Sequence, residues 1–173
     1  MILNEGMSYP LFWYFMIDKK TVQKLAEERI EELGTGLFIV DINISPSNSI
    51  SVELDKENGG VSIDECVSVS RNIEHNLDRE QADFELNVSS AGLDKPLRHP
   101  RQFQKYIGKP VAVKFNDGKK QEVTLLEATD NRIKFQYEVT EKPEGSKKKI
   151  KKNIEETAEL SAVKEVKVVI QFK

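Results

Sequence analysis

Residues 88–100 divide the sequence into two parts whose hydrophobic residues follow different periods. This segment contains two prolines and a glycine, which restrict the backbone and, at the prolines, remove hydrogen-bond donors. It also carries Leu93 and Leu97, whereas a flexible linker would be rich in glycine and serine without such residues. We therefore expect a structured joint at 91–100, between an N-terminal domain at 16–90 and a C-terminal domain at 101–173.

The part before the joint mixes helical and strand periods. A helix is expected between Asp18, which can cap it, and Gly34, which can end it. Two alternating segments follow, and Ser62 to Glu65 form a capping box that opens a second helix. We expect one apolar face of that helix to hold Ile63, Cys66, Val67, Ile73 and Leu77. A third alternating segment carries Phe84, Leu86 and Val88, so the order helix-strand-strand-helix-strand predicts a two-layer α/β domain.

The part after the joint shows only the strand period. Apolar and polar residues alternate in four segments: 111–115, 123–125, 133–139 and 166–172. The first two are separated by Asn116, Asp117 and Gly118, a typical hairpin turn. Short strands joined by tight turns predict a small all-β barrel, so the whole chain is expected to be α+β.

Charge differs sharply between the two parts. Residues 1–100 contain 9 Lys and Arg against 18 Asp and Glu, a net charge of −9, and residues 101–173 contain 17 against 11, a net charge of +6. Such a division predicts two domains with differently charged partners. The acidic part suits a basic protein. Alternatively, the acidic residues are only the solvent-exposed face of an amphipathic helix: Glu27, Glu28, Glu31 and Glu32.

Lysines are concentrated near the end of the chain, in a stretch interrupted by Pro143 and Gly145. As a flexible loop, this stretch could neutralise several RNA phosphates and release their counterions. The alternative is a solvated hairpin tip that keeps the protein soluble. We favour RNA contact by Lys147, Lys148, Lys149, Lys151 and Lys152.

The joint also carries a recognisable motif, made of Ser89, Ser90, Gly92, Leu93, Asp94, Lys95, Pro96 and Leu97. It resembles the signature of the RimP family of ribosome maturation factors, and residues 103–111 resemble that family's entry into its second domain. This sequence differs from the family signature at Ala91, where the family often has proline. It differs again at Lys95, which replaces an arginine and lacks the planar guanidinium fork.

This resemblance implies an N-terminal α/β domain followed by an Sm-like barrel. It further implies a cytoplasmic, non-enzymatic factor for ribosome biogenesis, which binds rRNA and a basic ribosomal protein near the decoding centre. Such a factor would bind the immature small ribosomal subunit and assist its late assembly. A free-standing Sm-like RNA chaperone acting on non-ribosomal RNA is the alternative function.

Cysteine and histidine give no sign of catalysis or metal binding. Cys66 is the single cysteine, so no internal disulfide can form, and we expect it in the core. His75 is expected on an exposed helix face and His99 in the joint, without metal-ligand spacing. We therefore expect no metal, no cofactor and no catalytic residue. A hydrolase would need a pocket holding titratable groups with perturbed pKa values.

Residues 9–17 form an apolar run that is too short to span a bilayer. No basic residue precedes it and no cleavage site follows, which disfavours a signal peptide. We expect residues 1–15 to be a non-native or upstream extension, with Met16 as the working start. We also expect a monomer that does not bind membranes.

Overall fold

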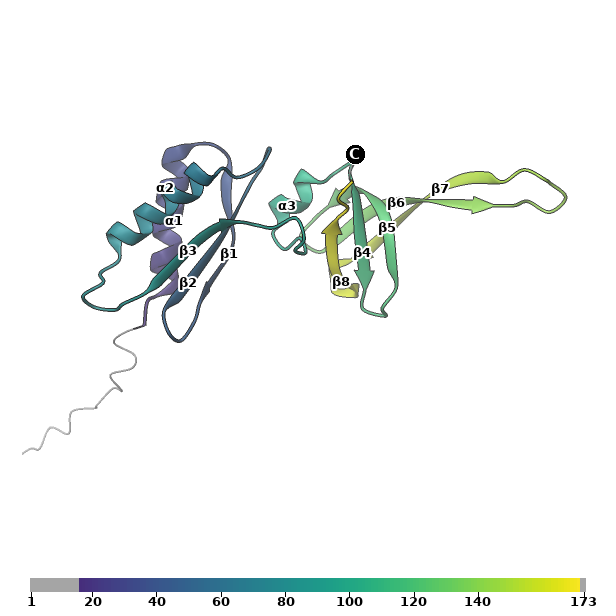
Figure 1. Cartoon of the computed structure of the whole chain (residues 1–173). Helices are drawn as coiled ribbons and strands as arrows, with labels where there is room; N and C mark the ends of the chain where they lie inside the picture. Colours follow the sequence, from purple (N-terminus) through teal and green to yellow (C-terminus); the bar gives the residue numbers. More distant parts are fainter. Residues whose placement is uncertain (1–15, 172–173) are drawn as a thin grey trace, which may run out of the picture. The chain divides into compact units, whose positions relative to one another are not determined.

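A computed structural model describes residues 16–171 (Figure 1). The expectations for residues 1–15, and for Phe172 as a strand residue, lie outside this range. The chain divides into two compact units, residues 1–91 and 92–173. Each unit has a hydrophobic core of its own.

The first unit is a three-stranded sheet with two helices on one face (Figure 1). Its elements are α1 (Lys19–Leu33), β1 (Leu37–Ile44), β2 (Ser49–Lys56), α2 (Ile63–Asn76) and β3 (Glu85–Ser90). The sheet order is β1-β2-β3, with β1 antiparallel and β3 parallel to β2. Because β2 and β3 are parallel, α2 crosses over the sheet between them. The predicted order of elements is confirmed.

Both helices begin where the sequence predicts, and α1 also ends at the predicted residue. The carboxylate of Asp18 accepts a hydrogen bond from the backbone N–H of Thr21, and Gly34 ends α1 in the left-handed region with φ of 61°. At the start of α2, Ser62 and Glu65 form the complete capping box. These contacts satisfy backbone groups that a helix end would otherwise leave without partners.

The prediction for the buried face of α2 is wrong at its N-terminal half. Ile63 is 82% exposed and Val67 is 40% exposed, whereas Val69 and Ile73 are fully buried. The inward stripe begins with a charged residue, Glu65, whose carboxylate accepts hydrogen bonds from Ser62 and Lys56. Because a charged residue belongs to the buried face, the pattern of apolar residues along the helix predicts the wrong face as buried. Cys66 is only partly buried.

A register shift in β1, between Ile39 and Asp41, also changes the predicted alternation. The extra residue of such a bulge turns the following side chains to the other face of the strand. The sequence pattern predicts Phe38, Val40, Ile42 and Ile44 on one face of this strand. Because of the bulge, Ile39 instead of Val40 packs against the core with Ile42 and Ile44.

The second unit is a five-stranded antiparallel sheet preceded by a short helix. Its elements are α3 (Pro100–Lys105), β4 (Pro110–Phe115), β5 (Lys120–Ala128), β6 (Arg132–Glu141), β7 (Ile150–Glu159), the 3₁₀ turn η2 (Leu160–Ala162) and β8 (Val163–Val168). The sheet order is β7-β6-β5-β4-β8, so β7 and β8 are its edges. Among residues 92–171 no strand pair closes this sheet, and the expected closed barrel is corrected to an open sheet.

Helix α3 is not predicted by the sequence periodicity. His99 caps it through Nδ1, which accepts from the backbone N–H of Arg101, while the Gln102 side chain accepts from the backbone N–H of His99. Phe103 and Tyr106 then enter the second core with Val111, Leu125 and Phe135. No helix in residues 16–171 is both long enough and apolar enough to cross a membrane.

Candidate functional site

The lysine-rich stretch lies on a long hairpin formed by β6 and β7 (Figure 1). The strands pair from Arg132 with Glu159 to Glu141 with Ile150, and residues 142–149 connect them. Lys147, Lys148 and Lys149 lie in this connection, where the Lys148 backbone N–H donates to Ser146 Oγ at 3.2 Å. Lys151 and Lys152 belong to β7, so the expectation of a single flexible loop is wrong for these two.

The hairpin has one face on which opposite charges are paired. Lys151 is paired with Glu138 at 2.5 Å, and Lys134 is paired with Glu155 at 3.1 Å. The hydrogen bond to Glu138 raises the pKa of Lys151, and the charge of Glu138 adds to this effect. This carboxylate therefore offsets the charge of Lys151. In the described part of the chain, Lys147, Lys148, Lys149 and Lys152 are exposed and form no ion pair.

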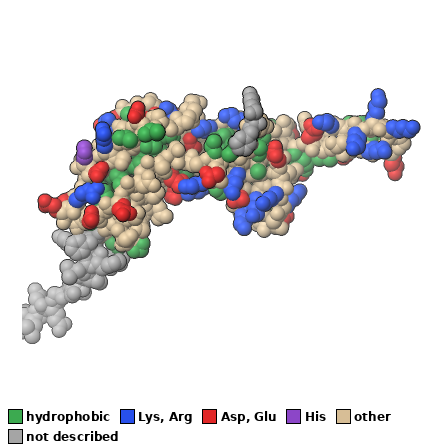
Figure 2. Space-filling model, viewed as in Figure 1, with side chains coloured by type: hydrophobic (Ala, Val, Ile, Leu, Met, Phe, Trp, Pro, Cys, Tyr) green, Lys and Arg blue, Asp and Glu red, His purple; other side chains and the backbone are tan. Residues whose placement is uncertain are grey.

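The other face of the hairpin is partly apolar. Because side chains alternate along a strand, Lys152 shares this face with Tyr137, Val139, Ile150 and Ile154. Ile150 is 54% exposed, and the Tyr137 hydroxyl donates to Glu156 Oε1 at 2.7 Å, which raises the Tyr137 pKa. Figure 2 shows Lys and Arg side chains gathered around the end of the hairpin, with hydrophobic side chains along it. The alternation at 133–139 predicts Tyr137 and Val139 on one face, but the sequence does not predict that Ile150 and Ile154 of β7 extend it.

The joint motif spans the boundary between the two units. Ser89 and Ser90 end β3, opposite Glu53 and Leu54 of β2. A turn follows, in which the backbone N–H of Lys95 donates to the carbonyl of Gly92 at 3.2 Å. A Cβ atom at Gly92 would collide with the carboxylate of Asp94. Glycine therefore lets Asp94 keep its position in the turn.

The end of the motif is anchored in the second unit. Leu97 is buried in that core, and its backbone N–H donates to the carbonyl of Val166 at 2.7 Å. Leu93, in contrast, is 54% exposed, and Pro96 is half-buried. The motif thus contributes a strand end, a turn and one core residue.

The first unit remains acidic at its surface. Residues 16–91 contain 7 Lys and Arg and 16 Asp and Glu. Glu27, Glu28, Glu31 and Glu32 of α1 are exposed, as both readings of this helix expect. Arg29 donates to Ser68 Oγ at 2.8 Å and pairs with Glu32 at 2.5 Å.

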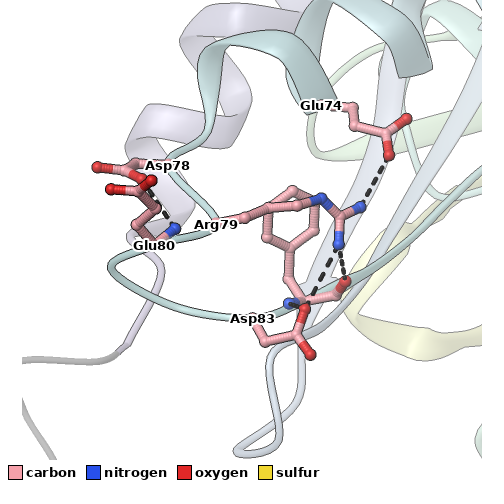
Figure 3. A network of polar contacts seen from close by, with 6 residues as sticks. Glu74, Asp78, Arg79, Glu80 and Asp83 are labelled. Atoms are coloured by element: carbon pink, nitrogen blue, oxygen red, sulfur yellow. Dashed lines mark hydrogen bonds and ion pairs between the residues drawn. The ribbon is translucent and has the colours of Figure 1, made fainter.

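Another arginine of this unit holds the loop between α2 and β3 (Figure 3). Arg79 pairs with Glu74 at 2.8 Å and Asp83 at 3.4 Å, and it donates to the carbonyl of Phe84 at 3.3 Å. Its guanidinium also lies 4.2 Å from the centre of the Phe84 ring. Arg79 is half-exposed, and the carboxylates of Glu74 and Asp83 offset its charge.

Cys66, His75 and His99 lie in different surroundings. Burial raises the pKa of the Cys66 thiol, and the nearby Glu65 carboxylate adds to the shift, so the reactive thiolate is disfavoured. Burial lowers the pKa of His99, whose ring caps α3, and His75 is exposed on α2. Within residues 16–171, no group of three or more His, Cys, Asp or Glu could hold a metal ion.

The fold and these surfaces define a two-unit α+β protein with an acidic first unit and a lysine-rich hairpin in the second. Residues 25–94 match the family model of the RimP N-terminal domain. The ribosome maturation factor RimP of Christiangramia forsetii is 42% identical over 154 residues, which cover 89% of this chain and 99% of that protein. The corresponding protein of Flavobacterium psychrophilum is 37% identical over 157 residues, or 91% and 100% of the two chains.

A third relative, the ribosome maturation factor RimP of Porphyromonas gingivalis, is 37% identical over 87% of this chain and 97% of its own length. The chain therefore belongs to the RimP family of ribosome maturation factors. This membership favours a role in ribosome maturation over the alternative of a free-standing RNA chaperone.

Proposed function

We propose that the chain binds the immature small ribosomal subunit and assists its late assembly without catalysing a reaction. The observation that carries this proposal is the cluster of lysines without ion pairs on the β6–β7 hairpin, in a chain of this family. An assembly factor must hold RNA until the subunit is complete and then leave. Contacts between lysines and phosphates suit this task, because they position a protein without requiring a particular base sequence.

The proposed rRNA site consists of Lys147, Lys148, Lys149 and Lys152, with Lys151 as a paired neighbour. Residues 101–173 carry a net charge of +6, which would attract RNA over a longer range. Glu155, Glu156 and Glu159 lie toward the other end of β7, so within this strand the positive charge lies toward the tip of the hairpin. The open sheet with its preceding helix serves, in this proposal, as an Sm-like module.

The acidic first unit is the proposed site for a basic ribosomal protein near the decoding centre. Its exposed carboxylates would speed the encounter with a positively charged partner. The joint motif would connect the two binding units. We further propose that the protein acts as a cytoplasmic monomer.

The proposed function is tested by removing the protein from cells. If it assists small-subunit assembly, sucrose gradients should show more free subunits and fewer assembled ribosomes. The small subunits should also contain unprocessed 16S rRNA. A variant in which Lys147, Lys148, Lys149 and Lys152 are replaced by Gln should restore the profile less well than the wild-type chain. An unchanged gradient after removal would contradict the proposal.

A further inference from the structure

A shallow groove of about 520 Å³ runs between α2 and β3. The apolar side chains on its α2 side are Ile63, Cys66 and Val67, and those on its β3 side are Leu86 and Val88. Figure 2 shows hydrophobic side chains reaching the surface of this unit over α2 and β3. The groove is therefore lined in part by the apolar stripe of α2 that does not face the core.

The apolar side chains of this stripe are more exposed than is usual for apolar residues on a surface helix. Ile63 is 82% exposed and Val67 is 40% exposed, although α2 buries Val69 and Ile73 on another face. Contiguous apolar side chains next to a groove mark binding surfaces more often than isolated ones do. The stripe thus has the composition of a surface that is covered by a partner.

The groove is bordered by a free strand edge. β3 pairs only with β2, and within residues 16–171 no hydrogen bond joins the outer backbone edge of residues 86–90 to another segment. Proteins normally protect such edges with lysine, proline, a bulge or a covering segment, because an open edge readily pairs with another chain. Residues 86–90 are Leu-Asn-Val-Ser-Ser, with no charge or proline, and their register with β2 has no shift.

The other edges of the two sheets differ from β3 in this respect. β1 has a bulge near Ile39, β7 carries Lys151 and Lys152, and β8 carries Lys164 and Lys167. These features discourage pairing with a further strand. β3 carries a single charge, Glu85 at its start. In the described part of the chain, residues 86–90 are thus a sheet edge without lysine, proline or a bulge, and they border the apolar groove.

We propose that an extended segment of a basic protein binds along β3 as a fourth strand and inserts alternate apolar side chains into the α2–β3 groove. Strand addition supplies backbone hydrogen bonds, and the groove selects apolar side chains at every second position. The excess of 16 acidic over 7 basic residues in 16–91 favours Lys and Arg at the remaining positions. This inference rests on the proposed function, because it assigns a site to the basic ribosomal protein.

The test uses the full chain with Ile63→Asp as the main variant and Ser90→Pro as the second. Ile63 is exposed, so its replacement should leave the fold intact. An aspartate at this position should weaken binding, because an apolar side chain of the partner would bury its charge. The backbone N–H groups of Glu85 and Ala91 point toward the β2 side, so by alternation the N–H of Ser90 points outward, and proline at position 90 would remove a donor from the free edge. Ile170→Asp is the matched control, since Ile170 is 47% exposed and belongs to the other unit. Circular dichroism and thermal unfolding verify that each variant is folded.

The first readout is binding to salt-washed immature small subunits. We expect Ile63→Asp to weaken binding about tenfold, as for a central apolar contact, and Ile170→Asp to change it less than about twofold. Amide exchange at residues 86–90 should slow in the wild-type complex. If the wild-type chain binds subunits and Ile63→Asp binds equally well, the groove proposal fails and the proposed function stands. If the wild-type chain does not bind subunits, the proposed function itself fails.

The second readout uses two blocked peptides, Lys-Val-Arg-Val-Lys-Val and Glu-Val-Asp-Val-Glu-Val. The proposal expects the basic peptide to bind the wild-type chain, to slow exchange at residues 86–90 and to lose affinity for Ile63→Asp. Equal binding of the acidic peptide would contradict it. Two other occupants would also overturn it: a second copy, seen as a dimer that Ile63→Asp dissociates, or residues 1–15, seen as faster exchange at 86–90 when the chain starts at Met16.

Discussion

Glu65 is the buried charged residue that connects α2 to the sheet. Its carboxylate accepts from the backbone N–H of Ser62 at 2.8 Å and from Lys56 Nζ at 2.9 Å. The backbone hydrogen bond, followed by the bond to Lys56, lowers the Glu65 pKa from 4.5 to about 2. Both interactions favour the ionised form, so they outweigh the cost of burying it.

This lowered pKa makes a prediction for Glu65→Gln. The native charge stabilises the fold fully above pH 4.5, and this contribution is lost as the pH falls toward 2. We expect the substitution to lower the free energy of unfolding by about 1–2 kcal/mol at pH 7, typical of a charged hydrogen bond. Urea unfolding at pH 7, 4 and 2.5 should show the gap between variant and wild type closing. A gap that is constant with pH would contradict this role.

The sequence predicts local signals well and long-range packing less well. Asp18, Gly34 and the Ser62–Glu65 capping box act within one helical turn, so their effects can be recognised without knowing the fold. The buried face of α2 depends instead on Lys56, which lies on another element and makes a buried glutamate acceptable. No hydrophobic pattern within the helix contains that information.

At the scale of elements, the two apolar stripes of α2 have different roles. Ile73 is fully buried in the first core, whereas Ile63 lies at the α2–β3 groove and is 82% exposed. Their side chains are identical, so their burial alone should decide what each contributes to stability.

Alanine substitutions at these two positions test the assignment of the faces. Ile73→Ala should lower the free energy of unfolding by about 2–4 kcal/mol, because it removes buried methyl groups and leaves a cavity. Ile63→Ala should change it by less than about 0.5 kcal/mol, as expected for an exposed position. Chemical denaturation measures both values. Similar losses at the two positions would show that both stripes face the core.

The β6–β7 hairpin shows a second limit of sequence analysis. The concentration of lysines is evident from the sequence, but the pairing of Lys151 with Glu138 depends on the register that places Thr140 opposite Lys151. Helix α3 is also hard to predict, since it has six residues and begins at a histidine cap. The residue types of the candidate RNA site were therefore predicted from the sequence. The paired-charge face and the apolar face of the hairpin could be identified only from the structure.

The hairpin register also sharpens the prediction for RNA binding. Replacing Lys147, Lys148, Lys149 and Lys152 with Gln should weaken small-subunit binding and reduce its salt dependence, because fewer counterions are released. Each lost phosphate contact should lower the log–log salt slope by about one unit. Lys151→Gln is the control inside the same hairpin and should change the slope little, since Glu138 already offsets its charge. Binding titrations at several salt concentrations give the slopes.

If the fourfold variant keeps the wild-type slope, the hairpin is only a solubilising surface. If Lys151→Gln alone reduces the slope as much as the four substitutions, the ion pair with Glu138 does not persist on the subunit. Circular dichroism serves as the folding control for both variants, whose stability should change little because these positions are exposed.

At the scale of the whole molecule, the chain joins two units of opposite charge. The first is an acidic α/β unit with a free strand edge, and the second is a β unit with a basic hairpin. Each has a separate core, so each could hold its own partner while the joint motif keeps both on one chain. In the proposed function, the acidic unit binds a basic protein and the basic hairpin binds RNA.

The central claim is that the protein binds the free, immature small subunit. The most direct test is to follow the full chain through a sucrose gradient of a cell extract at low salt. We expect it to sediment with free small subunits and to be absent from assembled ribosomes, because a maturation factor must leave before translation begins. Raising the salt should release it from the subunits. Equal occupancy of free small subunits and translating ribosomes would contradict the account.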